Sequence, residues 1–230
     1  MSGFFFAAAA AGGVAEQPID GQTGVWIKQG GVTVSSGIKM TGATVSTGQA
    51  QYIYDRGAAT ATTVAGGGRM NVSSGGTATS VSVNSGGLAY VYAGGVMSSA
   101  SIYASGYVYL YGGTADSTVV DSMGFLFVYS GGTANGVTLR NGRLHVFSAG
   151  TATSVAASAG TILYQSDGGA IAGATIHRAA YFYVRGGTAT SVTVESAGML
   201  VVSSGCTALA VVSSAGAVVT VAEGGYIAYA

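Results

Sequence analysis

The sequence predicts an all-β fold, a single-stranded parallel β-helix (β-solenoid) of about ten coils, in which each coil takes roughly 18–20 residues. Three observations support this prediction: a repeat of near-constant period, alternation of apolar residues within each repeat, and glycine pairs between the alternating stretches. When each repeat forms one coil, its apolar side chains are buried only by stacking on neighbouring coils, which is how a solenoid is stabilised.

Composition excludes several other classes of protein. The chain has 230 residues with 40 Gly and 1 Pro, and only 7% of them are charged, against roughly 25% in an average protein. Hydrophobic residues make up 49%, so the chain is not a disordered Gly/Ser linker. The 8 basic and 8 acidic residues are scattered and cancel, which argues against nucleic acid or an anionic membrane as a partner. Zero net charge favours self-association.

The repeat is clearest where residues 75–93 and 186–204 are compared, both beginning Gly-Gly-Thr-Ala-Thr-Ser-Val. A half-unit around residues 24–35 precedes ten consecutive units, and a broken unit at 224–230 follows them. The repeat domain is therefore expected to span residues 24–230. The ten units begin at Ser36, Arg56, Gly75, Gly94, Gly112, Gly131, Ala149, Gly168, Gly186 and Gly205.

Each unit contains two short stretches in which apolar residues alternate with others, a period that indicates strands with those residues facing inward. Glycine pairs separate the stretches, where the chain must turn with positive φ. At about 4.8 Å per coil, ten coils give a rod roughly 50 Å long. The inward residues include Val81 and Val83, Val137 and Leu139, Val192 and Val194 in the first stretch, and Val108 and Leu110, Leu126 and Val128, Leu144 and Val146 in the second.

If Val108 and Leu110 face inward, the tyrosines that alternate with them face outward. Aromatic residues at equivalent sites stabilise a sheet by about 0.2–1 kcal/mol per pair, which is one interpretation. The other is an interface, because so large an aromatic face exceeds what a soluble monomer usually exposes and tyrosine suits protein and glycan contacts. An interface with another copy of the chain is favoured. The predicted face comprises Tyr52, Tyr54, Tyr90, Tyr92, Tyr107, Tyr109, Tyr111, Phe125, Phe127, Tyr129, Phe147, Tyr181 and Tyr183.

The ends of the chain also suggest association. Residues 1–23 are expected to form an apolar cap or an inter-subunit segment that docks through Phe4, Phe5 and Phe6. The apolar run is too short to span a bilayer and lacks the basic start of a signal peptide, so no transmembrane segment is expected. The terminal coils of a solenoid expose unpaired strand edges, and insertion of residues 1–23 into a neighbouring copy would build a filament. Self-capping is the alternative.

The units Gly-Gly-Thr-Ala-Thr-Ser-Val-x-Val-x-Ser-x-Gly resemble the AIDA-type repeats of self-associating autotransporter adhesins, over residues 24–230. The resemblance implies a right-handed β-helix at the bacterial cell surface or outside the cell, with roles in adhesion, autoaggregation and biofilm formation. Members of that family can be O-glycosylated on repeat serines by heptosyltransferases. The matching positions here include Ser73, Ser74, Ser203 and Ser204.

Catalysis is not expected, although some β-helices carry polysaccharide lyases and hydrolases, which need converging carboxylates. Neighbouring coils should place Asn135 beside Asp116 and Arg140 beside Asp121, rather than further acids. His145 and His177 fall in different repeats, so no metal site is expected. The single Cys206 excludes an intramolecular disulfide and is expected to be a small buried residue. No cofactor is indicated.

Three functions remain after these exclusions. The first, which the sequence favours, is an extracellular structural or adhesive subunit that associates with itself into filaments, bundles or cell aggregates. The second is an adhesin passenger that binds cell-surface glycans through the aromatic face. The third is a segment of a phage or secreted fibre.

Overall fold

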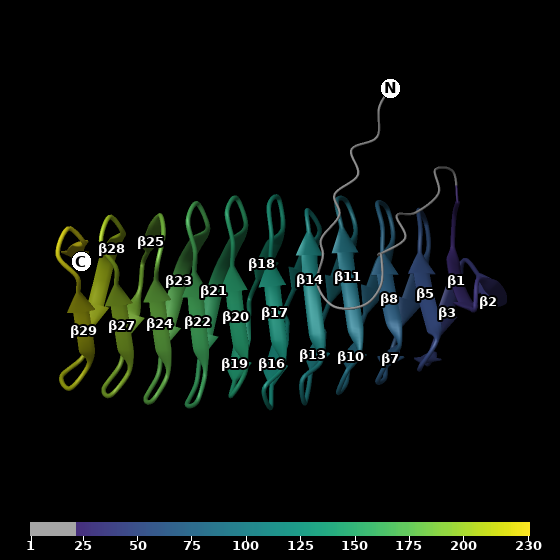
Figure 1. Cartoon of the computed structure of the whole chain (residues 1–230), viewed down its shortest axis with the longest axis horizontal. Coiled ribbons are helices and arrows are strands. Elements are labelled where there is room, and N and C mark those ends of the chain that lie inside the picture. Colours follow the sequence, from purple (N-terminus) through teal and green to yellow (C-terminus); the bar gives the residue numbers. More distant parts are fainter. Residues whose placement is uncertain (1–21) are drawn as a thin grey trace, which may run out of the picture.

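The computed structural model describes residues 22–230, and over this range the chain is a stack of coils built from thirty β-strands without a helix (Figure 1). The coils lie side by side along the long axis, with strands β1 and β2 at one end and β29 at the other. A front sheet of twelve strands and a back sheet of eighteen run the length of the stack. The predicted all-β solenoid of about ten coils is therefore confirmed. The predicted docking residues Phe4, Phe5 and Phe6 lie outside the described residues.

The front sheet contributes one strand per coil, and its ten strands from β5 to β29 are parallel. Leu88 lies opposite Tyr107, and Tyr107 lies opposite Phe125, so each partner is one repeat further along the chain, as the sequence predicts. The strands are β1 (Val25–Gln29), β2 (Val32–Gly37), β5 (Gln49–Ile53), β8 (Arg69–Val72), β11 (Leu88–Tyr92), β14 (Tyr107–Tyr111), β17 (Phe125–Val128), β20 (Arg143–Val146), β22 (Ile162–Gln165), β24 (Tyr181–Val184), β27 (Met199–Val202) and β29 (Val218–Val221).

The back sheet contains two rows of short strands, so most coils have three strands where the sequence predicts two. The additional row is the Thr-Ala-Thr segment, whose inward residue is a small alanine that gives a weak hydrophobic signal. The first row is β3 (Lys39–Thr41), β6 (Ala58–Thr60), β9 (Thr77–Thr79), β12 (Val96–Ser98), β15 (Thr114–Asp116), β18 (Thr133–Asn135) and β25 (Thr188–Thr190). The second is β4 (Thr44–Val45), β7 (Thr63–Val64), β10 (Ser82–Val83), β13 (Ser101–Ile102), β16 (Val119–Asp121), β19 (Thr138–Arg140) and β26 (Thr193–Val194). The remaining strands are β21 (Thr151–Ala157), β23 (Ala170–Ile176), β28 (Thr207–Ser213), which pair with strands of both rows, and β30 (Tyr226–Tyr229), which pairs with β28.

A bend separates the two rows of the back sheet and repeats along the stack. Ser80, Ser99 and Ser117 occupy it with φ angles of 55°, 52° and 53°. A left-handed conformation costs a non-glycine residue roughly 1–2 kcal/mol. The N–H of Ser80 donates to the carbonyl of Ser98 in the next coil (2.9 Å), and equivalent bonds offset that cost along the stack.

The core is the space between the two sheets, and its side chains stack from coil to coil. Leu126 lies opposite Leu144, and both are fully buried. The inward residues that the sequence predicts in both stretches are 0–1% exposed, as expected. Each fully buried leucine or valine contributes about 1.5–3 kcal/mol relative to an exposed one.

The glycine pair at each corner serves two different purposes, as Gly75 and Gly76 show. Gly75 has a φ of 73°, which favours glycine. Gly76 has an ordinary φ, but a Cβ on it would collide with the carbonyl oxygen of Ile53 in the preceding coil. The pair therefore turns the chain and lets the coils approach closely.

The first two strands differ from the half-repeat that the sequence predicts around residues 24–35. Strand β1 is antiparallel to both β5 and β2, so the segment is a hairpin on the edge of the front sheet. Its loop is Gly30-Gly31, with φ angles of 57° and 82°. Positive φ at both central residues is the requirement of a tight two-residue hairpin turn, which explains the reversal.

Candidate functional site

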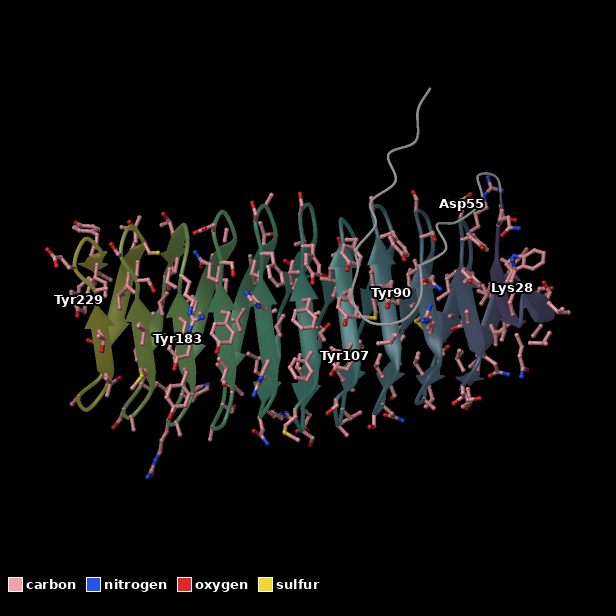
Figure 2. All side chains as sticks on the ribbon, viewed as in Figure 1. Lys28, Asp55, Tyr90, Tyr107, Tyr183 and Tyr229 are labelled. Carbon is pink, nitrogen blue, oxygen red and sulfur yellow. The ribbon has the colours of Figure 1, made fainter. Side chains whose placement is uncertain are left out.

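Outward side chains of the front sheet form three rows that run along the stack, and those of β11, β14 and β17 are mainly aromatic. Figure 2 labels Tyr90, Tyr107 and Tyr183 on this face. The rows arise because residues at equivalent positions of successive parallel strands lie directly opposite one another. The central row is Tyr52, Asn71, Tyr90, Tyr109, Phe127, His145, Tyr164 and Tyr183. One flanking row includes Leu88, Tyr107, Phe125, Arg143, Ile162 and Tyr181, and the other includes Tyr92, Tyr111, Tyr129 and Phe147.

The rings of β11, β14 and β17, together with Tyr129 and Phe147 directly after β17 and β20, form one continuous aromatic panel. Rings in neighbouring coils stack with centroids 5.2 Å apart for Tyr90 and Tyr109 and 4.6 Å apart for Tyr129 and Phe147. The planes are inclined by 13° and 1°. The aromatic panel comprises Tyr90, Tyr92, Tyr107, Tyr109, Tyr111, Phe125, Phe127, Tyr129 and Phe147, each of which contacts another member.

This stacking decides which part of each ring a partner can reach. In the middle of the panel, Tyr109 has Tyr90 on one face and Phe127 on the other, both at 5.2 Å. The panel therefore offers ring edges and hydroxyls to a partner, and not ring faces. Edges of aromatic rings carry positive charge and the hydroxyls both donate and accept hydrogen bonds, so the surface is amphipathic.

All thirteen predicted aromatic residues lie in strands of the front sheet or directly after them, but they form more than one group. Nine make up the aromatic panel. Tyr52 and Tyr54 stack on each other one strand before the coil of Arg69 and Asn71, which interrupts the rows. Tyr181 and Tyr183 lie on β24 beyond the panel. Tyr54 (3% exposed) and Tyr52 and Tyr92 (each 8%) are more buried than a free outer face would be.

The structure adds residues that the sequence reasoning missed. His145 lies in the central row, 3.9 Å from the ring of Phe147, and its Nε2 lies 2.6 Å from Ser166 Oγ. Tyr164 continues the row and stacks on Tyr183 at 5.3 Å. The outward position of Tyr164 was not predicted, because the next inward residue is Gln165, a fully buried amide that interrupts the alternation of apolar residues. Counting from the register of β20 would have placed both residues on the face.

The environment of the panel shifts the proton affinity of its side chains. Burial, reinforced by the neighbouring Tyr90, Tyr129 and Tyr107, raises the pKa of Tyr109 to about 12. Burial and the adjacent Tyr129 raise the pKa of Tyr111 further still. Burial lowers the pKa of His145, and the nearby charge of Arg185 adds to the effect. The panel therefore favours neutral side chains.

Cationic side chains lie over several of the rings. The guanidinium of Arg185 is 4.9 Å from the ring centre of Tyr164 and 5.3 Å from that of Tyr183. Arg143 lies 5.5 Å over Phe125, and Lys28 lies 5.4 Å over Tyr52. Such contacts contribute about 0.5–1 kcal/mol each at exposed sites.

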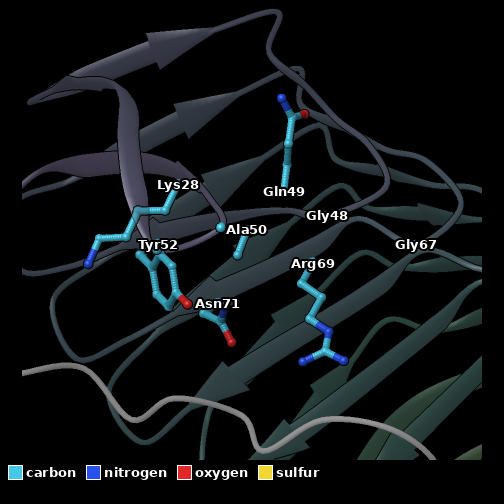
Figure 3. A pocket seen from close by; sticks show the side chains of 10 residues that line it. Lys28, Gly48, Gln49, Ala50, Tyr52, Gly67, Arg69 and Asn71 are labelled. Atoms are coloured by element: carbon cyan, nitrogen blue, oxygen red, sulfur yellow. The ribbon is translucent and has the colours of Figure 1, made fainter.

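A shallow cavity of about 330 Å³ lies beside the first hairpin (Figure 3). Lys28 projects from β1 on one side, and Arg69 and Asn71 project from β8 on the other. Its remaining wall consists mainly of backbone at glycine corners, together with Gln49, Ala50 and Tyr52. The lining residues include no Asp, Glu, His, Cys, Ser or Thr side chain.

Asp116 and Asp121 lie beside the residues that the sequence predicts. Asp116 lies opposite Asn135 and accepts a hydrogen bond from its amide (2.9 Å), and Asp121 lies opposite Arg140. His177 and Glu195, directly after β23 and β26, pair at 2.8 Å, a contact that the sequence does not predict. Within residues 22–230, no three His, Cys, Asp or Glu side chains are grouped to hold a metal ion, and no helix could span a membrane. Cys206 is buried and free, as predicted.

The four candidate modification sites occupy equivalent corners after β8 and β27, yet they differ in access. Ser74 and Ser204 are exposed, and Ser203 is half-buried. Ser73 is only 4% exposed and its hydroxyl oxygen is buried. The geometry therefore favours Ser74 and Ser204 for any enzyme that must reach a hydroxyl.

The terminal strands expose apolar side chains. Within the described range, nine of the twelve exposed large hydrophobic residues lie at the two ends of the stack. At the first end they are Val32, Val34 and Ile38, and at the last end Leu209, Val212, Val218, Val221, Tyr226 and Tyr229.

Comparison with solved structures finds a chain of similar fold. No family model matches the present chain, and no curated protein does. Among solved structures, the crystal structure of the TibC-catalysed hyper-glycosylated TibA55-350 fragment is similar, with a TM-score of 0.75 and 28% sequence identity. The match covers 84% of this chain and 82% of that fragment. The chain is thus similar to the TibA fragment in fold over most of its length and, at this identity, in sequence.

Proposed function

We propose that this chain is a non-enzymatic, adhesive β-solenoid of the bacterial cell surface that associates with other copies of itself through the aromatic panel. The observation that carries the proposal is the continuity of the panel over four neighbouring coils, with ring edges and hydroxyls directed outward. The likeness to the TibA fragment supports the adhesive class, as does the resemblance of the repeats to AIDA-type repeats.

The panel has the physical properties of a contact surface. Its rings are held by stacking before any partner arrives, so little side-chain entropy is lost on binding. The hydroxyls of Tyr107, Tyr109 and Tyr111 lie at one coil and can pair with hydroxyls of a second copy. A chain with zero net charge has no overall repulsion to oppose such an approach.

The first test replaces the tyrosines of strand β14. We expect Tyr107→Ser, Tyr109→Ser and Tyr111→Ser together to raise the dissociation constant for self-association at least tenfold, because they remove three contact rings from the centre of the panel. Sedimentation velocity across a concentration series measures the effect.

Two controls separate adhesion from folding. The triple Tyr→Phe variant at the same positions keeps the stacks and removes only the hydroxyls, so it folds normally and shows how much the hydroxyls contribute. Replacing the back-sheet threonines Thr133, Thr151 and Thr188 by serine leaves association unchanged. If the triple serine variant is folded and associates as the original chain does, the panel is not the interface.

We further infer that exposed corner serines accept glycosylation, since the similar TibA fragment is hyper-glycosylated by TibC. Co-expression with TibC is expected to add sugar mass that Ser74→Ala and Ser204→Ala reduce, whereas Ser73→Ala does not, because Ser73 is buried. Intact-mass and peptide mass spectrometry measure this. Unchanged sugar mass in the Ser74→Ala and Ser204→Ala double variant would exclude these two sites.

A further inference from the structure

Charge is distributed unevenly around the solenoid. None of the twelve front-sheet strands contains Asp or Glu, although the whole chain has equal numbers of acidic and basic residues. Four of the eight basic residues lie on this face: Lys28, Arg69 and Arg143 within its strands and Arg185 directly after β24. The described acidic residues lie on the back sheet or at corners: Asp55, Asp116, Asp121, Asp167, Glu195 and Glu223. The front face is therefore locally cationic on a neutral protein.

Arg143 and Arg185 are the two basic residues placed to recognise an anion. Both are exposed, and neither forms an ion pair or a side-chain hydrogen bond with any described residue. Their contacts are with rings: Arg143 with Phe125, and Arg185 with Tyr164 and Tyr183. A guanidinium over a ring is attracted to it while its fork of N–H donors remains unpaired, and such a fork can bind a carboxylate with two hydrogen bonds.

The two arginines are offset both along the axis of the stack and across the front face. Strands β20 and β24 are separated by one strand, so their axial spacing is about 10 Å, twice the strand spacing of about 4.8 Å. Arg143 aligns with Tyr181, and Arg185 lies four residues further along the strand direction, about 13 Å across the face. A linear polymer that carries acidic groups at intervals and crosses the front face obliquely can reach both arginines. Between them, His145, Tyr164 and Ser166 offer hydrogen-bonding groups.

We propose that this part of the front face, from β20 to β24, binds an anionic polysaccharide of the uronic-acid class, with Arg143 and Arg185 each binding a carboxylate. Sugar hydroxyls find partners in the tyrosine, serine and histidine groups between the two arginines. This ligand is a different partner from the second copy invoked above, and the proposal does not depend on self-association.

Other polyanions fit the face less well. Duplex DNA is bound mainly through many phosphate contacts made by a dense basic surface, and a chain with four cations dispersed along one face does not provide that. Anionic membranes recruit clusters of 4–8 Lys or Arg residues, and the front face has no such cluster. Uronate chains have a lower charge density and a hydroxyl-rich surface, which the mixture of arginine and tyrosine complements.

The test measures binding of polygalacturonate to the whole chain by calorimetry or biolayer interferometry, with neutral dextran as the uncharged comparison. We expect binding to polygalacturonate and none to dextran. Each of Arg143→Gln and Arg185→Gln should weaken binding about tenfold, and the double variant about a hundredfold, since hydrogen bonds to charged groups are the stronger ones and distant sites add. The variants Arg143→Lys and Arg185→Lys keep the charge but lose the fork, and should fall between.

The chain provides its own matched controls. Arg140 and Arg178 are exposed and lie outside the strands of the front sheet, at the end of β19 and at the corner after β23. Arg140→Gln with Arg178→Gln changes net charge as much as the double variant does. This control should bind polygalacturonate as the original chain does. Equal weakening by the control pair, or full binding by folded Arg143→Gln/Arg185→Gln, overturns the proposal. It is likewise overturned if duplex DNA, dextran sulfate or phosphatidylserine vesicles bind as tightly as polygalacturonate.

Discussion

Replacing Phe182 by alanine is expected to lower the free energy of unfolding by about 3–5 kcal/mol. Phe182 is fully buried and is the largest such side chain in the core, lying between Leu163 and Leu200 of the neighbouring coils. Truncation leaves a cavity that flanking coils cannot fill, because their spacing is fixed by backbone hydrogen bonds on both sheets. Urea unfolding followed by circular dichroism measures the loss.

The aromatic panel offers a matched control for the replacement of Phe182. Phe147→Ala removes the same side chain from the solvent-facing side, where it stacks on Tyr129 at 4.6 Å and on His145 at 3.9 Å. We expect a smaller loss of about 0.5–1.5 kcal/mol for each stacked pair. If the two replacements cost the same, the assignment of inward and outward faces on the front sheet is wrong.

The inward and outward faces could be predicted because a strand period of two and a repeat of near-constant length leave little choice of register. Val108 and Leu110 fix the orientation of β14, and with it the outward position of Tyr109. The third strand of each coil was missed, since an inward alanine such as Ala78 gives almost no hydrophobic signal. The first hairpin was missed because only the φ angles of Gly30 and Gly31 distinguish a reversal from a further coil.

The candidate site was only partly predictable from sequence. Aromatic residues at alternate positions could be assigned to the outer face from the sequence, whereas a histidine or an arginine in the same row could not. Tyr164 was also missed, because Gln165 interrupts the alternation of apolar residues that indicates the register of its strand. Ring stacking depends on side-chain orientation, which the sequence does not give. The sequence therefore cannot show that Tyr90 and Phe127 cover both faces of Tyr109. That fact changes the chemistry of the face from ring-face stacking on sugars to contacts by edges, hydroxyls and guanidinium forks.

The tyrosines of the aromatic panel should make the stability of the folded protein decrease at alkaline pH. A tyrosine of the panel would have to ionise beside other tyrosines that partly shield it from water, so its pKa in the folded state is raised above the value of 10.0 that it has when unfolded. Above pH 10 the unfolded chain loses protons that the folded chain retains, and the equilibrium shifts toward unfolding. The contribution of the neutral tyrosines to the free energy of unfolding is therefore fully present below pH 10. It is lost as the pH rises through about 12, where Tyr109 titrates.

Urea unfolding at pH values from 8 to 12, with the phenolate absorbance recorded in parallel, measures this effect. We expect the unfolding midpoint to fall steeply above pH 10. The double variant Tyr109→Phe and Tyr111→Phe should retain more stability at pH 11–12, because it keeps the stacks and removes two of the protons. Tyr103→Phe, at an exposed corner outside the panel, is the control and should follow the original profile. A midpoint that is independent of pH in this range, or equally affected in both variants, would show that the hydroxyls of Tyr109 and Tyr111 ionise as readily in the folded chain as in the unfolded chain.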